Sequence, residues 1–532
     1  MGLPDPSNPF LHFFCGPDDF VVPGPEIGGF YGISRCWGTW VLPMSAASPT
    51  PNHASDRFVA QVRRAILWRS GSHIVAQAVQ WGATFLVIRI LQPADYGLFA
   101  MTGVVLVLLN LLNGYGMASG VVQRPEVTRR EVAQLFGLLI AVNACLAAAQ
   151  WLLAPAFASY YRQPAVADLL RVQALLYACT PFVALPQALL AREMDFSGQA
   201  KANIAGAFAG GATALGGALG GWGVWTLVWA PIAIFATRGL VLTWAVGGLP
   251  RPVFDVRGTG ALLRFGGFMA AGQFFGFLWT QADMFIGGRH LSAHQLGLYS
   301  TALFLAQIFV SKFAPPIHDV AFATYAKLQH DRPAAGRAFL QFARLICVAG
   351  MPFHLGLAVT AEPLVLTLLG SQWADAAPIV QVLAASMAFY TVYVLLGPAA
   401  EGLGRPGLAA GNNAVAALVT PALLLVTVRW GVIGLAASWA IVFPLLLAIG
   451  LHRVLPLLEL SRRALFRVVA PPTAAALAMA AVVVLADRFA ADLPAPVRLL
   501  LLVGLGGAVY GGWMLAFARD ALGKLWSLAR RR

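Results

Sequence analysis

Arg89 to Phe99 reads RILQPADYGLF, and two hundred residues later Arg289 to Tyr299 reads RHLSAHQLGLY. Both stretches contain an arginine, a leucine and a Gly-Leu-aromatic run in the same register. Each lies between two apolar segments of about 20 residues, which is the length a helix needs to cross a membrane. We therefore interpret each stretch as the turn of a transmembrane hairpin, and the repetition indicates two related halves.

Composition predicts an all-α integral membrane protein. Of the 532 residues, 59% are hydrophobic and only 11% are charged, whereas soluble domains carry about 25% charged residues. Apolar stretches recur along nearly the whole chain after residue 70. The five cysteines are scattered and mostly lie inside apolar segments, so they indicate neither a disulfide framework nor a metal site. We expect no metal and no cofactor.

The apolar pattern predicts about 14 transmembrane helices, and an even number places both termini on the same side. The expected spans are 70–91, 97–118, 132–154, 166–190, 202–220, 223–246, 265–287, 297–319, 341–361, 377–399, 408–428, 431–453, 467–487 and 497–518.

The distribution of basic residues predicts the orientation of these spans. With both ends inside, most of the 36 lysines and arginines fall on the inner side. The outer loops and adjoining span ends hold only Arg162, Arg171, Arg289, Arg429, Arg488 and Arg498. The positive-inside rule therefore predicts cytoplasmic termini. The net charge of +14 reflects this topology and attraction to anionic membrane lipids, not nucleic-acid binding.

A second repeated turn supports the two halves. WGVWTLV (Trp222 to Val228) joins spans five and six, and WGVIGLA (Trp430 to Ala436) joins spans eleven and twelve. Six crossings separate each pair, so the halves have the same orientation. This pattern predicts two six-helix lobes in a parallel pseudo-repeat, each repeated glycine starting a helix at the outer face, plus two C-terminal helices. The expected parts are a disordered extension (1–56), an N-lobe (57–250), a C-lobe (251–455), and spans thirteen and fourteen with a basic cytoplasmic tail (456–532).

Several segments resemble the polysaccharide-transporter family of the multidrug/oligosaccharidyl-lipid/polysaccharide exporter (MOP) superfamily, the Wzx-type flippases. They are IRILQPADYG (Ile88 to Gly97), QADMFIGGRHLSAHQLGLY (Gln281 to Tyr299), AFATYAKLQHD (Ala321 to Asp331) and LLGSQWADAAPIVQVLA (Leu368 to Ala384). The resemblance covers about residues 64–455. It implies a central cavity and the transfer of an undecaprenyl-diphosphate-linked oligosaccharide across the bacterial inner membrane, for O-antigen, capsule or exopolysaccharide synthesis. A polysaccharide polymerase is the partner implied.

Polar side chains form stripes on four of the expected spans. At about 100° per residue, members of each stripe share one helix face. The stripes contain His73, Gln77, Gln80 and Thr84; Thr102, Asn110 and Asn113; Ser300, Gln307, Ser311 and His318; and, less regularly, Gln273, Thr280, Gln281 and Asp283. We expect them to line the cavity and bind substrate. The alternative is hydrogen bonding between packed helices.

Charged residues within the spans are the second set of substrate-binding candidates, because intramembrane ionisable groups usually have a function. They are Arg89, Arg238, Asp283, Arg289 and Lys312. Arginine suits a diphosphate because its planar fork matches phosphate oxygens. Snorkelling to lipid phosphates is the alternative for Arg89 and Arg289. Asp283 is expected to face the cavity and to pair with Arg89.

Aromatic residues of the outer loops are open to two interpretations. Tyr160, Tyr161 and Trp373 either stack on sugars or belong to the interfacial aromatic belt, which is the simpler explanation.

Two other function classes compete with export. A membrane glycan polymerase or ligase requires catalytic residues, but the sequence contains no HExxH, no GxSxG and no paired-carboxylate cluster, so no enzyme is expected. A drug/cation antiporter of the same superfamily suits twelve spans and several intramembrane carboxylates. This chain has fourteen expected spans and one clear carboxylate.

Overall fold

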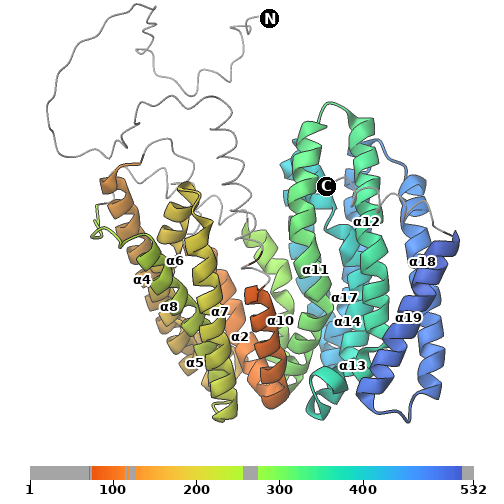
Figure 1. Ribbon diagram of the computed structural model, residues 1–532, viewed down its shortest axis with the longest axis horizontal. Helices are drawn as coiled ribbons and strands as arrows, with labels where there is room; N and C mark the ends of the chain where they lie inside the picture. The colour runs from red at the N-terminus through yellow and green to blue at the C-terminus, as the bar shows by residue number, and fades with distance from the viewer. Residues whose placement is uncertain (1–70, 72–74, 114–116, 119–126, 256–272, 518–532) are drawn as a thin grey trace, which may run out of the picture. The chain divides into compact units, whose positions relative to one another are not determined.

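The computed structural model describes residues 71, 75–113, 117–118, 127–255 and 273–517. All of them belong to the compact unit Thr50–Arg532. The expected extension and basic tail lie outside these ranges, as does His73. Every regular element within the described ranges is helical (Figure 1). The helices are Val75–Ile90, α2 (Pro93–Asn110), α4 (Arg129–Tyr161), α5 (Ala165–Gln173), α6 (Leu175–Arg192), α7 (Phe196–Leu219), α8 (Trp225–Ala245), α10 (Ala282–His290), α11 (Ala293–Lys327), α12 (Arg332–Val359), α13 (Ala361–Leu368), η2 (Ser371–Ala376), α14 (Ala377–Tyr393), α15 (Leu396–Gly402), α16 (Pro406–Thr427), η3 (Val428–Trp430), α17 (Gly431–Val454), η4 (Pro456–Leu458), α18 (Arg462–Phe489) and α19 (Ala495–Phe517).

The all-α membrane class is confirmed. Ten helical stretches among the described residues are long and apolar enough to cross a membrane, and one of them, Pro406–Leu458, contains both α16 and α17. The glycine- and alanine-rich α7 is not among the ten. Every expected span overlaps at least one described helix, but the count of fourteen remains a prediction.

The two repeated hairpin turns start their helices at equivalent positions. α2 begins at Pro93 and α11 at Ala293, four residues before the expected starts. Local capping explains the difference. The backbone N–H of Gln92 donates to Asp95 Oδ2 (3.1 Å), and Ser292 and Gln295 form a capping box with two bonds of 3.2 Å. These bonds satisfy amide groups that would otherwise be unpaired at a helix start.

Gly97 and Gly297 therefore lie inside their helices, and the expectation that each begins a helix is wrong. A Cβ on Gly97 would run into the carbonyl oxygen of Ala293, and a Cβ on Gly297 would run into that of Pro93. The two glycines thus let α2 and α11 cross with their backbones in contact, as small residues do in membrane helices. This reciprocal contact is what a pseudo-two-fold relation between the hairpins produces.

The second pair of glycines behaves as expected. Gly223 has φ +55° and precedes α8, while Gly431 has φ +71° and begins α17. Both have a positive φ, which glycine accepts without strain. The repeated Trp-Gly-Val motif is therefore a turn whose shape requires glycine.

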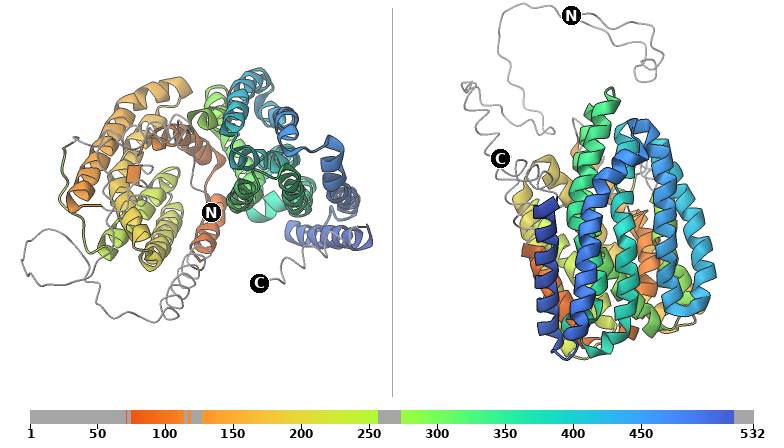
Figure 2. Two further views of the ribbon diagram at one scale, coloured as in Figure 1. Left: turned by 90° about the horizontal axis from the view of Figure 1, so that it is seen from above. Right: turned by 90° about the vertical axis from the view of Figure 1, so that its right-hand side faces the viewer.

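Contacts divide the described helices into two bundles. The first bundle contains the helix Val75–Ile90, α2 and α4–α8, and the second contains α10–α17, with α2 of the first bundle packing on α11 of the second. α18 and α19 contact α12 and α13 and form a pair at the edge of the second bundle (Figure 2). The helix Val75–Ile90 packs on α7 through Ala83 and approaches α11 through Phe85, whose ring lies 6.5 Å from that of Phe304.

The turn before α7 carries a capping carboxylate. Asp195 Oδ1 accepts hydrogen bonds from the Ser197 hydroxyl (2.6 Å) and the Ser197 backbone N–H (2.9 Å). These bonds, led by that from the hydroxyl, lower the pKa of the Asp195 carboxyl. The ionised form is favoured at the start of a helix because the amide dipoles point toward it.

Candidate functional site

The two repeated arginines make equivalent contacts between the bundles. Arg89 Nη1 donates to the carbonyl oxygen of Thr367 (3.3 Å), in the last turn of α13. Arg289 Nη1 donates to the carbonyl oxygens of Tyr160 and Ser159, in the last turn of α4, and its Cζ lies 5.5 Å from the Tyr160 ring centroid. Carbonyls at a helix C-terminus lack intrahelical partners and carry the negative end of the helix dipole. Each arginine thus caps a helix that belongs to the opposite bundle.

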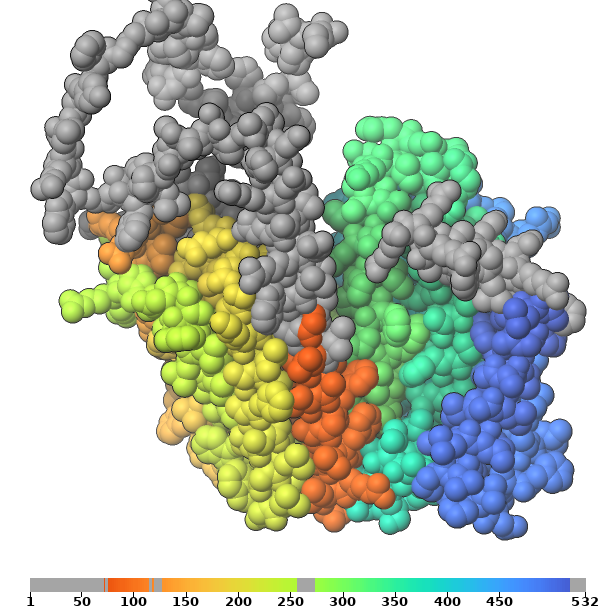
Figure 3. Space-filling model, in the orientation of Figure 1, coloured from red at the N-terminus to blue at the C-terminus, as the bar shows by residue number. Residues whose placement is uncertain are grey.

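A buried tryptophan adds a second contact at the same end. Trp373, in η2, is fully buried and donates from Nε1 to the carbonyl oxygen of Ile88 (2.9 Å). The neighbouring Gln372 Nε2 donates to the carbonyl oxygens of Arg89 (2.9 Å) and Leu91 (3.2 Å). Two side chains of η2 therefore cap the end of the helix Val75–Ile90. In the space-filling view, teal surface from this region lies against the orange surface of the first helices (Figure 3).

These findings correct the two interpretations of Trp373. It neither stacks on sugars nor belongs to an aromatic belt, because its ring is enclosed by protein. Tyr160 also packs on protein, with its ring stacked on that of Phe285 at 4.5 Å between centroids. We use the name hairpin-end closure for a set of contacts between the bundles. The set comprises Arg89, Arg289, Gln372, Trp373 and the crossing of α2 and α11 at Gly97 and Gly297.

A further polar contact joins the bundles farther along α11. Lys312 Nζ donates to Gln77 Oε1 (2.7 Å) and lies 5.5 Å from the Trp81 ring centroid. Lys312 is fifteen residues beyond Gly297, which corresponds to about 22 Å along the helix. Two levels of cationic contact therefore exist between the bundles, and the one farther from the hairpin turns involves a glutamine of the predicted stripes.

Asp283 does not pair with Arg89, and that prediction is wrong. The Asp283 side chain is fully buried, and its Oδ2 accepts a hydrogen bond from the hydroxyl of Tyr299 (2.8 Å). Trp439 Nε1 in turn donates to that hydroxyl oxygen (2.6 Å). The turn between α10 and α11 brings Tyr299 next to Asp283, so the partner of the carboxylate lies within the second bundle.

The remaining candidates are dispersed. Thr102 accepts a hydrogen bond from Gln173 Nε2 (2.9 Å) inside the first bundle, which is helix-packing chemistry. Arg238 Nη2 donates to Gln187 Oε1 (3.5 Å), also within the first bundle. Asn113 is buried and donates to Asn110 Oδ1 (3.1 Å). Side chains that retain exposed surface are Gln80, Asn110, Gln273, Gln307 and, partly, Gln281.

Sequence reasoning did not single out Gln372 or Glu401, and it did not predict that Trp373 packs inside the protein. Gln372 and Trp373 lie in the segment LLGSQWADAAPIVQVLA. This motif identifies the residues, but the sequence does not show which groups they contact. Glu401 lies two residues beyond the expected end of its span and was therefore not counted among intramembrane charges. His318 Nε2 lies 3.5 Å from its carboxylate.

The described residues thus form an all-helical, multi-pass membrane protein whose two bundles meet through the hairpin-end closure. The chain belongs to the polysaccharide biosynthesis protein family, whose model matches residues 86–378, more than half of the chain.

Relatives and solved structures agree with this assignment. The chain is 28% identical to the succinoglycan biosynthesis transport protein ExoT of Rhizobium meliloti (strain 1021) over 475 residues, which cover 87% of this chain and 95% of that protein. It is 24% identical to the lipopolysaccharide biosynthesis protein WzxC of Escherichia coli (strain K12), covering 56% of this chain and 60% of that protein. Its fold matches that of the Lipid II flippase MurJ in an inward closed conformation, with a TM-score of 0.69, 12% identity and coverage of 86% of this chain and 100% of the flippase.

Proposed function

We propose that this protein is a flippase that moves a lipid-diphosphate-linked oligosaccharide, of the undecaprenyl type, across the bacterial inner membrane for surface polysaccharide synthesis. Both termini lie in the cytoplasm, in keeping with the basic-residue distribution. The domains are an N-lobe of residues 57–250, a C-lobe of residues 251–455 and the two C-terminal spans. It is a transporter and not an enzyme, and it delivers its cargo to a polysaccharide polymerase.

The observation that carries this proposal is the reciprocal arginine contact of the hairpin-end closure. A transporter with two access states needs contacts that are stable in one state and separable in the other. Among the described residues, the hydrogen-bond acceptors of Arg89 and Arg289 are neutral carbonyl groups, so separation of these contacts leaves no carboxylate unpaired. Release of the arginines at the outer end then exposes two guanidinium groups.

Those guanidinium groups match the cargo. A diphosphate is a better partner for arginine than a carbonyl dipole, because both partners are then charged and the planar guanidinium binds two phosphate oxygens at once. Lys312, at the inner level, provides the first cation, and Arg89 and Arg289 provide the second. Arg238 and the exposed glutamines and asparagines of the stripes remain candidates for contacts to the glycan.

An apolar groove supports a lipid-linked substrate. A cavity of about 480 Å³ lies between α11, α12, α13, α18 and α19. Its walls are almost entirely apolar and include Phe85, Leu305, Met479 and Val503. Such a groove accommodates a hydrocarbon chain, because burial of apolar surface is its main stabilising interaction with protein. The lipid tail remains there while the sugar head group passes between the bundles.

The environment of Asp283 weighs against the cation-antiporter alternative. An antiporter needs a carboxylate that exchanges its partner for a cation. Asp283 is enclosed and hydrogen-bonded to Tyr299, so the clearest carboxylate of the described spans has a structural partner.

The decisive experiment combines genetics with reconstitution. Deletion of the protein should make the cell accumulate lipid-linked oligosaccharide on the cytoplasmic face. Purified protein in liposomes should move a fluorescent polyprenyl-diphosphate oligosaccharide between leaflets, which an impermeant quencher detects. The Arg89→Ala/Arg289→Ala variant should lose this activity, while Arg171→Ala, whose guanidinium pairs with Asp168 inside the first bundle (3.1 Å), should keep it. Absence of leaflet exchange by the wild-type protein would contradict the proposal.

A further inference from the structure

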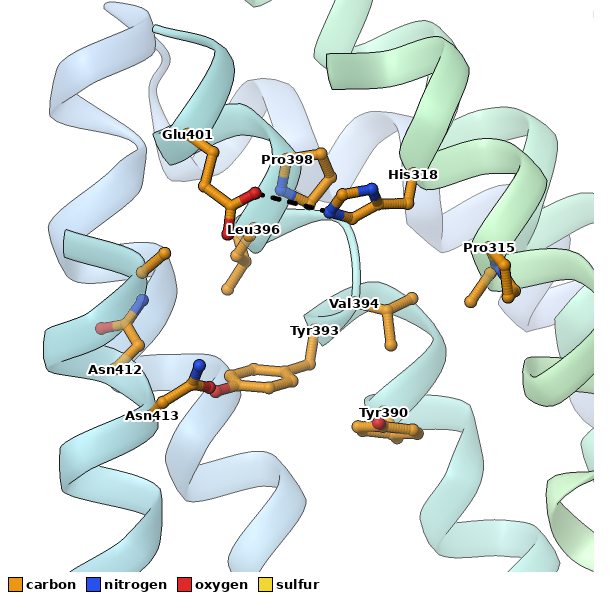
Figure 4. A pocket seen from close by; sticks show the side chains of 13 residues that line it. Pro315, His318, Tyr390, Tyr393, Val394, Leu396, Pro398, Glu401, Asn412 and Asn413 are labelled. Carbon is orange, nitrogen blue, oxygen red and sulfur yellow. Dashed lines mark ion pairs between the residues drawn. The ribbon is translucent and has the colours of Figure 1, made fainter. Parts of the chain in front are cut away.

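A cavity whose lining includes several polar side chains lies in the second bundle, toward the end of α11 that is remote from the hairpin turns. It has a volume of about 320 Å³ and is lined by α11, α14, α15 and α16 (Figure 4). His318 Nε2 of α11 lies 3.5 Å from Glu401 Oε2 of α15, and the two side chains are 44% and 39% exposed. The histidine–carboxylate pair therefore bridges two helices and is only partly covered by protein.

A proline pair inside α11 and a break between α14 and α15 lie near this pair. α11 contains Pro315 and Pro316 one turn before His318, and proline removes a backbone hydrogen bond and kinks a helix. α14 ends at Tyr393, and α15 begins only at Leu396. The pair thus connects a continuous helix that lacks backbone hydrogen bonds at its two prolines with a short helix that two residues separate from α14, and the backbone bends easily at both places.

Carboxylates of α11 and α15 face the His318 ring. Asp319, on the same helix, places Oδ1 3.7 Å from His318 Nδ1, and Glu401 faces the other ring nitrogen. From α17, Arg453 Nη1 donates to Asn412 Oδ1 (3.2 Å), an amide that lines the same cavity.

The tyrosines of α14, Tyr390 and Tyr393, complete the lining with largely buried rings. Two carboxylates therefore act directly on the imidazole, while the nearby cation acts through an amide.

We propose that His318 and Glu401 form a proton-binding site that operates as a latch between α11 and α15. Histidine is the side chain that ordinarily changes charge between pH 5 and 8. A proton on the imidazole converts the long contact between a neutral imidazole and the Glu401 carboxylate into an ion pair, and the ion pair holds α15 more tightly against α11. Loss of the proton to water loosens it.

The latch affects the contact between the bundles because Lys312, which makes that contact, also lies on α11, about 9 Å before His318 along the helix. Movement of α11 at the proline pair changes the position from which Lys312 reaches Gln77. Proton binding therefore biases the inner contact between the bundles. This inference concerns a proton and not the cargo, so it goes beyond the proposed function.

Amide hydrogen exchange of the full-length protein in lipid nanodiscs tests the latch. Exchange is followed in α15 and in α11 beyond Pro316, at about pH 8 and about pH 6, with correction for the intrinsic chemical rate. A half-exposed ion pair should raise the protection of α15 about threefold at the lower pH. His318→Gln and Glu401→Gln should each abolish the rise, because Asp319 lies on the same helix as His318 and does not bridge to α15.

His294→Gln is the matched control, since His294 is exposed near the opposite end of α11; it should keep the threefold rise. Gly402→Ala provides a second test. A Cβ there would lie 2.7 Å from Tyr325 Cβ and 2.8 Å from the Phe322 carbonyl oxygen of α11, so it should lower protection at both pH values. Protection of α15 that does not depend on pH in the wild-type protein would overturn the latch, as would a rise in protection at low pH that survives His318→Gln. Neither result would affect leaflet exchange in liposomes, which tests the proposed function separately.

Discussion

Removal of the two repeated arginines should open the hairpin-end closure. Arg289 contacts two carbonyl oxygens and the Tyr160 ring and is half-buried, whereas Arg89 makes one longer contact and is exposed. A hydrogen bond to a charged group contributes about 1.5–3 kcal/mol when desolvated, and exposure reduces this. We assign about 1.5 kcal/mol to Arg289 and about 0.5 kcal/mol to Arg89.

These values translate into populations. Arg289→Ala should raise the ratio of open to closed molecules about tenfold, Arg89→Ala about twofold, and the double variant about thirtyfold. Arg289→Lys should recover part of the effect, because lysine keeps the charge but loses the planar fork. The ordering of the two single variants follows from their different burial.

Thiol labelling measures the open population. Thr301 lies one turn beyond Gly297 on α11 and is 2% exposed, so Thr301→Cys in a background without other cysteines reports access through the closure. A membrane-impermeant maleimide is added to right-side-out vesicles, and the labelling rate is compared between variants. Arg171→Ala is the control at an arginine that pairs within its own bundle.

A specific outcome would refute this reasoning. If Arg289→Ala is as abundant as the parent protein and labels at the parent rate, the arginine does not hold the closure. If labelling occurs only from the opposite side of the membrane, the hairpin turns face the cytoplasm and the orientation is wrong.

Three further predictions concern stability, measured as thermal unfolding of the purified protein in detergent. Trp373→Phe should cost about 1–3 kcal/mol because it leaves the buried carbonyl of Ile88 without its donor; unchanged unfolding would show that this carbonyl finds another partner. Gly97→Ala should cost roughly 1–3 kcal/mol by forcing α2 from α11, while Gly103→Ala, with nothing within 4 Å of the added methyl group, should cost nothing, and equal effects would contradict the crossing. Asp195→Ala should cost about 1 kcal/mol at neutral pH. Because hydrogen bonding lowers the folded-state pKa of Asp195, this difference should be present above pH ~4 and disappear as the pH falls through the lowered pKa; a difference that grows in acid would contradict it.

The sequence by itself determined the class of the protein and the pairing of its hairpins. Membrane helices satisfy their backbone hydrogen bonds locally, so length and hydropathy are sufficient to find them. The repeated turns were visible because each needs particular residues at fixed positions. Gly223 and Gly431 need freedom at positive φ, and the capping side chains at the starts of α2 and α11 lie within four residues of the amides they bind.

Only the tertiary structure decided what the side chains contact. Arg89 was visible as a charge near the end of a span, but its acceptor is a backbone carbonyl 278 residues away, and every residue type carries such a carbonyl. Asp283 was visible as a costly buried carboxylate, but helix periodicity does not encode the return of Tyr299 through the hairpin. Local patterns identify which groups need partners, whereas the approach of distant helices selects those partners, because that approach depends on packing summed over the whole bundle.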